Sequence, residues 1–158
     1  MKRILTIALV MVLASVAQAA AVEQIRLTPS EITGKEAVGA GAGTSGVAGI
    51  RTTVLLGNPT KPGLYTIRLS IPANTSIQAH THRDNRSAIV MSGTWHFGYG
   101  SVANAAATKA LPPGSLYTEP GGVAHFALTR AEPVVVYITG FGPTDTVYLN
   151  TANDPRDK

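Results

Sequence analysis

The hydrophobic and polar positions along most of this chain alternate with the two-residue period of β-strands. The clearest case is LYTIRLSI at 64–71, where every second side chain is large and apolar. Such a period is typical of a strand with one buried and one exposed face. Similar stretches predict eight further strands, at 52–56, 76–80, 87–91, 94–99, 115–118, 124–129, 133–139 and 146–149.

Glycine and proline separate these stretches, and no sustained helical period appears after residue 20. Turn sequences such as GNP at 57–59 and PPG at 112–114 suit short connections between strands. The alanine-rich segment 103–110 allows either one or two helical turns or a loop followed by an edge strand. Many short strands spaced by about 8–12 residues indicate a sandwich or a barrel. We therefore expect a single all-β domain.

The first 19 residues form a different kind of segment. Lys2 and Arg3 precede an almost unbroken apolar run at 4–16, which the small residues of an Ala-Gln-Ala sequence follow. These are the features of a secretory signal peptide. The run is shorter than the about 20 residues that span a bilayer. We expect cleavage after Ala19 and a periplasmic or secreted mature protein without further contact with the membrane.

The rest of the chain divides into three parts. Residues 20–48 form an N-terminal arm and a loop rich in glycine and alanine, residues 49–150 contain the predicted strands, and residues 151–158 form a polar tail. In the arm we expect a short strand at 25–27 and one turn of helix that starts near Ser30. We expect the tail to fray, as chain ends commonly do.

The loop GAGAGTSGVAG at 39–49 has the composition of a dinucleotide-binding loop. Loops that cradle phosphates follow an apolar strand and open a helix, and this one does neither. We interpret it as a flexible surface loop.

Composition narrows the possible partners and metal ligands. Without Lys2 and Arg3 the formal charge falls from +4 to +2, and the chain has no basic run or aromatic-rich stripe. We therefore expect no nucleic-acid partner. The chain contains no cysteine, so a metal site must use nitrogen and oxygen ligands. Thiolate zinc sites and iron–sulfur clusters are excluded.

Three of the four histidines are placed where they can converge. His80 and His82 are two residues apart at the end of a predicted strand, so both imidazoles project from the same face. His125 lies at the start of another strand, after a Pro-Gly-Gly turn. If that strand lies beside or opposite the first, three imidazoles can hold a divalent ion and leave positions open for water or substrate. We expect His96 to have no ligand role.

Two segments resemble the sequence motifs of the cupin superfamily. NTSIQAHTHRDNRSAIVMSG at 74–93 resembles the first motif, which contains His-x-His, a glutamate and a closing glycine. GSLYTEPGGVAHFALT at 114–129 resembles the second motif, with its glycines, proline and histidine at the expected spacing. The resemblance implies a single-domain cupin jelly-roll β-barrel with a metal near the mouth of its interior.

The chain departs from these motifs at three positions. Asn74 and Thr129 replace a glycine and an asparagine, which are mild changes. Arg86 replaces the glutamate that usually ligates the metal, and an always-cationic guanidinium cannot do so. Asp84 or Glu119 could supply an oxygen ligand instead.

Arg86 has two interpretations. It is either a surface arginine, paired for example with Asp84, or an inward-facing one that holds a carboxylate or another anion beside the metal. The forked donors of arginine suit the second role. We favour it because the motif position that Arg86 occupies faces inward.

The resemblance implies a metal-binding cupin, and the predicted signal peptide implies its export. We expect a small-molecule enzyme of the dioxygenase, lyase or isomerase type. The three histidines would hold a divalent ion, which could be iron, manganese, zinc, nickel or copper. Arg86 would orient a small oxygen-bearing substrate, anionic if Arg86 faces inward. Glu119 or Asp84 would be the acid or base.

The same motifs are compatible with two other functions. The chain could be a non-catalytic periplasmic cupin that binds or senses a metal or a small ligand. It could also be a structural barrel that has lost its metal. Cupins often dimerise through sheet edges, so the resemblance is also compatible with a homodimer.

Overall fold

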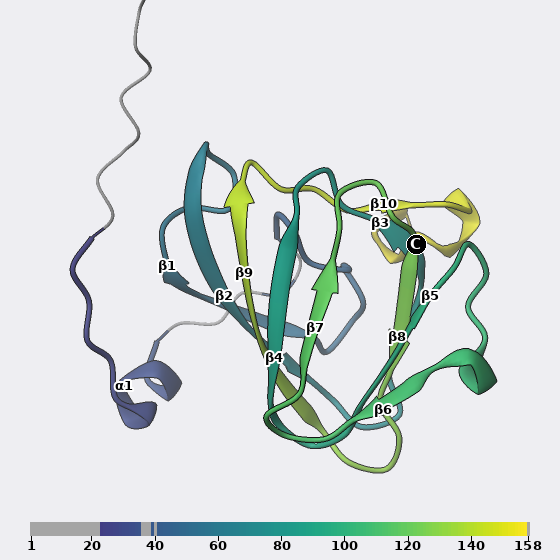
Figure 1. The fold of residues 1–158 in the computed structure, drawn as a ribbon, viewed down its shortest axis with the longest axis horizontal. Coiled ribbons are helices and arrows are strands. Elements are labelled where there is room, and N and C mark those ends of the chain that lie inside the picture. The colour runs from purple at the N-terminus through teal and green to yellow at the C-terminus, as the bar shows by residue number, and fades with distance from the viewer. Residues whose placement is uncertain (1–22, 36–38, 40, 158) are drawn as a thin grey trace, which may run out of the picture.

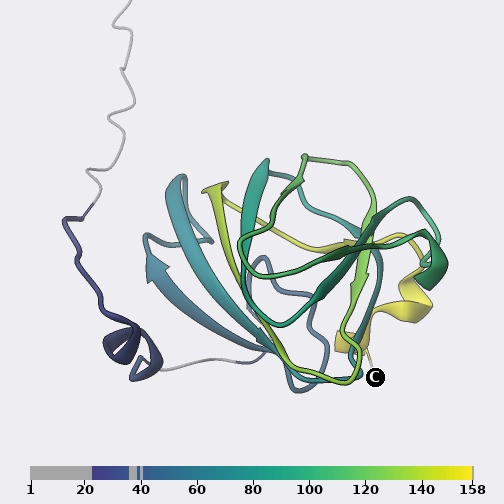
Figure 2. The same cartoon turned by 60° about the horizontal axis from the view of Figure 1, so that its bottom comes forward.

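The computed structural model describes residues 23–35, 39 and 41–157, so the expected signal peptide at 1–19 lies outside the described residues. Within them, ten strands form two five-stranded antiparallel sheets that face each other (Figure 1). Figure 2 shows the curved sheets enclosing a common interior. The expected all-β fold is confirmed.

The two sheets interleave strands that are distant in sequence. The first has the order β1 (Arg51–Leu56), β2 (Gly63–Ile71), β9 (Val134–Gly142), β4 (Arg86–Ser92), β7 (Leu116–Glu119). The second has the order β10 (Val147–Tyr148), β3 (Ser76–Thr81), β8 (His125–Leu128), β5 (Trp95–Tyr99), β6 (Lys109–Leu111). His80 in β3 and His125 in β8 therefore lie on neighbouring strands, and His82 directly follows β3.

The core lies between the sheets and consists of the inward half of each alternating strand. β2 buries Tyr65, Ile67 and Ile71 completely, and β9 beside it does the same with Val134 and Val136. Fully burying an apolar side chain of this size contributes about 1.5–3 kcal/mol. The long β2–β9 pair therefore anchors the barrel.

The N-terminal arm extends away from the barrel (Figure 1). Its helix α1 (Pro29–Thr33) begins at a capping box between Thr28 and Glu31, and Gly34 caps its end. The helical turn is thus present, but the strand expected at 25–27 does not form. Among the described residues no strand lies beside this part of the arm, and an unpaired strand leaves its backbone hydrogen-bonding groups without partners.

The alanine-rich segment 103–110 contains both of the expected forms. η1 (Ala105–Ala107) is a single 3-10 turn, and β6 follows it as the edge strand of its sheet. The side chain of Asn104 caps the turn by accepting a hydrogen bond from the backbone N–H of Ala106 at 3.0 Å.

The polar tail forms two 3-10 turns, η2 (Thr151–Asn153) and η3 (Pro155–Asp157), so the expectation that it frays was wrong. The guanidinium of Arg156 donates to the carbonyl oxygen of Thr146 at 2.9 Å and lies over the ring of Tyr148. The barrel thus offers this arginine both a backbone acceptor and an aromatic face.

The glycine-rich segment 41–47 packs into the barrel, so its interpretation as a flexible surface loop was also wrong. Ser45 is buried, and its carbonyl oxygen accepts a hydrogen bond from the Tyr148 hydroxyl at 2.5 Å. The carbonyl oxygen of Gly43 accepts one from Arg86 at 2.9 Å. Small residues allow the backbone to approach these partners closely.

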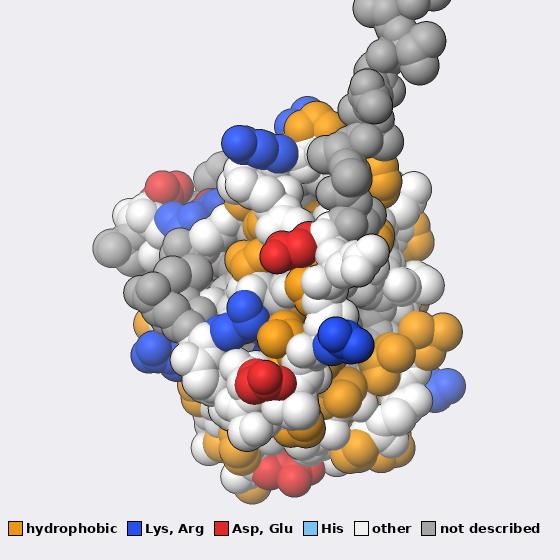
Figure 3. Space-filling view, turned by 90° about the vertical axis from the view of Figure 1, so that its left-hand side faces the viewer, with side chains coloured by type: hydrophobic (Ala, Val, Ile, Leu, Met, Phe, Trp, Pro, Cys, Tyr) orange, Lys and Arg blue, Asp and Glu red, His pale blue; other side chains and the backbone are white. Residues whose placement is uncertain are grey.

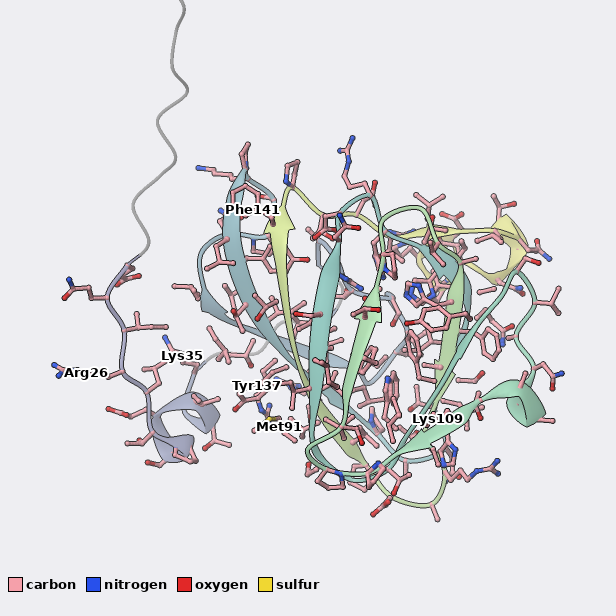
Figure 4. The ribbon with its side chains drawn as sticks, in the orientation of Figure 1. Arg26, Lys35, Met91, Lys109, Tyr137 and Phe141 are labelled. Atoms are coloured by element: carbon pink, nitrogen blue, oxygen red, sulfur yellow. The ribbon has the colours of Figure 1, made fainter. Side chains whose placement is uncertain are left out.

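The outer surface mixes apolar and charged side chains, with Lys, Arg, Asp and Glu interspersed on the face that Figure 3 shows. Met91, Tyr137 and Phe141 point away from the interior, on the outer side of the first sheet (Figure 4). In the described part of the chain, no helix is long and apolar enough to cross a membrane.

Replacing Gly43 by alanine is expected to destabilise the protein more than replacing Gly114. Both have a left-handed backbone, with φ of 74° and 85°, which costs a residue with a side chain about 1–3 kcal/mol. An added Cβ at Gly43 would lie 2.5 Å from Cγ2 of Thr144, whereas nothing lies within 4 Å at Gly114. We expect Gly43→Ala to lose about 1–3 kcal/mol more, measured by unfolding in urea. Equal losses would show that segment 41–47 does not pack into the barrel.

Candidate metal centre

A β-bulge in β3 turns His80 and His82 toward the barrel interior. Ile77 pairs with Ala127, but His80 pairs with His125, so β3 holds one extra residue between the two pairs. Without it, strict alternation would place the two histidines on the opposite face from Ile77. The bulge shifts the alternation by one position, and as a result Ile77, His80 and His82 are all buried around one cavity.

The three imidazoles converge inside the barrel. His125, at the start of β8, is the direct cross-strand neighbour of His80. The ring centroids of the three pairs lie 4.4 to 5.1 Å apart, and one ligand nitrogen of each ring lies within 4.8 Å of the others. All three side chains are buried. The structure therefore brings together the three residues that the sequence singled out.

Each imidazole is oriented by a hydrogen bond from its Nδ1 to a backbone carbonyl. The acceptors for His80, His82 and His125, in that order, are the carbonyl oxygens of Gln78, Asp145 and Val123, at 2.7, 2.5 and 3.1 Å. A carbonyl oxygen only accepts, so Nδ1 carries the proton and Nε2 keeps its lone pair. Metal-binding histidines are commonly held in this way.

The inward-facing nitrogens lack partners. Nε2 of His82 and of His125 is buried and makes no hydrogen bond within the described residues. Leaving a buried polar atom unpaired costs about 1–3 kcal/mol, so such atoms are rare. A divalent ion that accepts nitrogen and oxygen ligands, such as zinc, iron, copper, nickel or manganese, fits these lone pairs. The three histidines can therefore hold a metal ion.

Arg86 and Glu119 lie beside the imidazoles. They are direct cross-strand neighbours, Arg86 in β4 and Glu119 in β7. Both are buried. Nε of Arg86 donates to Oε2 of Glu119 at 2.6 Å, and Nη2 donates to the same oxygen. Arg86 thus faces inward, which agrees with the second of the two interpretations given above. The carboxylate that it holds belongs to Glu119, and the surface pairing with Asp84 does not occur.

The electrostatics of the centre keep the imidazoles neutral and the carboxylate ionised. Burial lowers the pKa of His80 to about 4 and, with the nearby charge of Arg86, that of His82 to about 2. Burial also lowers the pKa of His125. Burial is the largest single influence and raises the pKa of Glu119, but the positive charge of Arg86 and the three surrounding imidazoles together lower that pKa to about 2. These are the protonation states in which the groups ligate metals.

The structure does not bring Asp84 or His96 to this centre. Asp84 is buried, but its carboxylate accepts a hydrogen bond from the Tyr65 hydroxyl at 2.7 Å and does not line the cavity around the histidines. His96 alternates in β5 with the buried Trp95 and Phe97 and so faces the outer side. Its expected lack of a ligand role agrees with this position.

The space between the three imidazoles and the opposite wall is small. The cavity measures about 30 Å³ and is lined by the three histidines together with apolar and charged side chains, among them Leu69, Arg86, Phe97, Glu119 and Ile138. One water needs about 10–15 Å³ of such space, so the cavity has room for an ion and a water-sized ligand. Gly43 and Ser45 also line the cavity. Segment 41–47 therefore closes the site on one side.

Sequence reasoning missed the backbone groups that complete the site. The carbonyl oxygen of Asp145, which orients His82, lies 63 residues further along the chain. The pairing of β10 with β3, in which Val147 lies opposite Thr81, brings the two together. A backbone carbonyl has no sequence signature, because every residue carries one.

Comparison with known proteins identifies the fold. No protein-family model matches the chain, and no curated protein matches it. A structure of the polyketide cyclase RemF from Streptomyces resistomycificus aligns with 85% of this chain and 92% of its own, at 15% sequence identity and a TM-score of 0.68. An RmlC-like cupin from Shewanella frigidimarina aligns with 76% of this chain and 92% of its own, at 17% identity and a TM-score of 0.55.

A chain from the structures of the DMSP lyases RdDddP and RnDddQII is also similar, at 18% identity and a TM-score of 0.50. The alignment covers 59% of this chain and 47% of the lyase chain, so this chain spans about half its length. At such identities the likeness concerns the fold alone. The chain has the cupin jelly-roll fold, as its two motifs predicted.

The metal-free protein is expected to lose stability as the pH falls from about 6.5 toward 4. The pKa of His80 is 6.5 in an exposed state and about 4 in the folded state, so the unfolded chain takes up a proton first. Each such histidine gives a slope of up to about 1.4 kcal/mol per pH unit. Glu119 extends the loss between about 4.5 and 2. Urea unfolding with a chelator present, at a series of pH values, measures the slope.

Two variants show whether the buried histidines cause this slope. His125→Gln removes a group whose pKa burial lowers and should flatten the curve below pH of about 6.5. His96→Gln, on the outer face, should change it less. A metal-free wild type of constant stability between pH of about 7 and 5 would contradict the neutral burial of the imidazoles.

Proposed function

We propose that this cupin is an exported small-molecule enzyme that uses a divalent metal ion held by His80, His82 and His125. The observation that carries the proposal is the convergence of three buried imidazoles, one ligand nitrogen of each lying within 4.8 Å of the others. Similar folds also carry enzymes, since the neighbours include a polyketide cyclase and DMSP lyases. The apolar leader at 1–19 supports export.

The ion, the histidines and the apolar walls of the centre would have different roles. A bound divalent ion would polarise a carbonyl, stabilise an enolate or, if it is iron, bind dioxygen. The histidines offer neutral ligands whose orientation is set before binding by their Nδ1 hydrogen bonds. The apolar walls around them, including Leu69, Phe97 and Ile138, keep bulk water from the reacting atoms.

The size of the cavity limits the substrate. Pockets for organic ligands commonly measure about 300–1,000 Å³, which is ten times or more the volume of about 30 Å³ found here. The substrate is therefore either very small or enters when segment 41–47 shifts. Arg86 is held by Glu119 and Gly43, so substrate binding through its guanidinium would require one of these contacts to open.

The small cavity also favours a second candidate function, a non-catalytic periplasmic cupin that binds a metal. Such a protein needs room for the ion and little else, which matches the observed volume. The two candidates share the three-histidine centre and differ in whether an organic ligand ever reaches it.

Wild-type protein purified without a histidine tag is expected to contain about one divalent ion per chain. His80→Ala and His125→Ala each remove one of three ligands and should reduce the content to near zero. His96→Ala is the matched control, because it removes an imidazole from the outer face and should keep the ion. Elemental analysis by mass spectrometry measures all four proteins. Equal metal content in wild type and both ligand variants would refute the centre.

Turnover separates the enzyme from the binding protein. The metal-loaded protein would be assayed for oxygen consumption and for lyase or isomerase products with a panel of small keto and hydroxy compounds. Turnover that His125→Ala abolishes and His96→Ala keeps supports the enzyme. Metal bound at full occupancy without any turnover across the panel supports the binding function.

A further inference from the structure

We infer that Glu119 is a fourth ligand of the metal and that Arg86 positions it. The chain would then take its carboxylate ligand from β7 instead of from the position four residues after His82. The inference rests on the proposed three-histidine centre and adds the oxygen ligand that this centre lacks.

The strand register places the two charged groups in equivalent positions. Arg86 and Glu119 are direct partners in the antiparallel β4–β7 pair, and each is an inward, buried residue next to an exposed one. Directly paired residues have Cβ atoms about 4.5–5.5 Å apart. A carboxylate on either strand can therefore reach the same part of the interior. In this chain the carboxylate therefore stands at position 119, and the arginine stands at position 86, where the motif usually has the glutamate.

The carboxylate faces the same nitrogens that lack partners. Oε2 of Glu119 lies 3.7 Å from Nε2 of His82 and 3.9 Å from Nε2 of His125. Both imidazoles carry their proton on Nδ1, which donates to a carbonyl, so these Nε2 atoms and Oε2 are all acceptors. Acceptors that face one another at this range without a proton repel each other. A cation between them turns the repulsion into coordination.

Arg86 holds Glu119 in this orientation. Two of its nitrogens donate to one oxygen, Oε2, so the carboxylate keeps free lone pairs. Its Nη1 is tied to the carbonyl oxygen of Gly43 at 2.9 Å, which fixes the guanidinium from a second side. Because a guanidinium cannot ligate, Arg86 acts through Glu119 and not on the ion.

Glu119→Gln tests the ligand role directly. It removes the negative oxygen while keeping the shape of the side chain, and we expect zinc binding to weaken by about 100-fold or more, since even outer-shell changes cost about 10–100-fold. Zinc affinity is measured by competition with a chelating dye. The visible spectrum of the cobalt-substituted protein should also change, because it reports the ligand set.

The control is Asp84→Asn, which neutralises another buried carboxylate. Asp84 accepts a hydrogen bond from Tyr65 and does not line the cavity. This variant should therefore keep the zinc affinity and the cobalt spectrum of the wild type, even if it is less stable. A loss of affinity in both variants would overturn the inference, because any buried carboxylate would then have the same effect.

A double exchange covers the case in which Glu119→Gln fails to fold around an unpaired Arg86. Arg86→Glu combined with Glu119→Arg restores the ion pair across the same register, and we expect its zinc affinity to stay within about tenfold of wild type. Glu119→Arg alone should not bind zinc. A folded double variant that does not bind zinc would overturn the inference.

The outcomes separate this inference from the proposed function. If folded Glu119→Gln keeps the wild-type affinity and cobalt spectrum while His80→Ala loses zinc, the three-histidine centre stands and Glu119 is only the counter-ion of Arg86. If the wild type binds no divalent ion, the proposed function itself fails.

Discussion

The central physical constraint in this protein is a set of hydrogen-bond acceptors that face one another inside a closed barrel. Three imidazoles donate their only N–H to backbone carbonyls, and a carboxylate stands opposite two of them. Buried acceptors without donors are costly. An ion that binds the folded state and not the unfolded chain would offset that cost, and would link metal binding to stability.

The barrel makes this arrangement rigid by building it on strands instead of loops. His80 and His125 lie on two neighbouring strands, and His82 directly follows the first of these. Glu119 and Arg86 lie on two strands of the facing sheet. The long β2–β9 pair fills the rest of the interior with apolar side chains. A site whose residues come from several packed strands can hold acceptors together against their mutual repulsion, because no single strand can turn away alone.

A series of contacts connects the C-terminal tail and segment 41–47 to the three-histidine centre. Arg156 in the tail covers Tyr148, which donates to the carbonyl of Ser45, and the neighbouring Gly43 accepts from Arg86. The segments before and after the barrel therefore meet at its interior. The cavity that remains measures about 30 Å³. The enzyme and the metal-binding protein would share this centre and would differ in whether an organic ligand reaches it.

The sequence by itself determined the features that are local: the alternating strands and the two motifs that identified the cupin fold and its three histidines. It could not determine which way those histidines face, because one extra residue in β3 decides it and shows only in the pairing with β8. The partner of Arg86 and the burial of segment 41–47 were equally hidden. Both depend on contacts across 33 and 43 residues of chain, and only tertiary structure sets such register and packing.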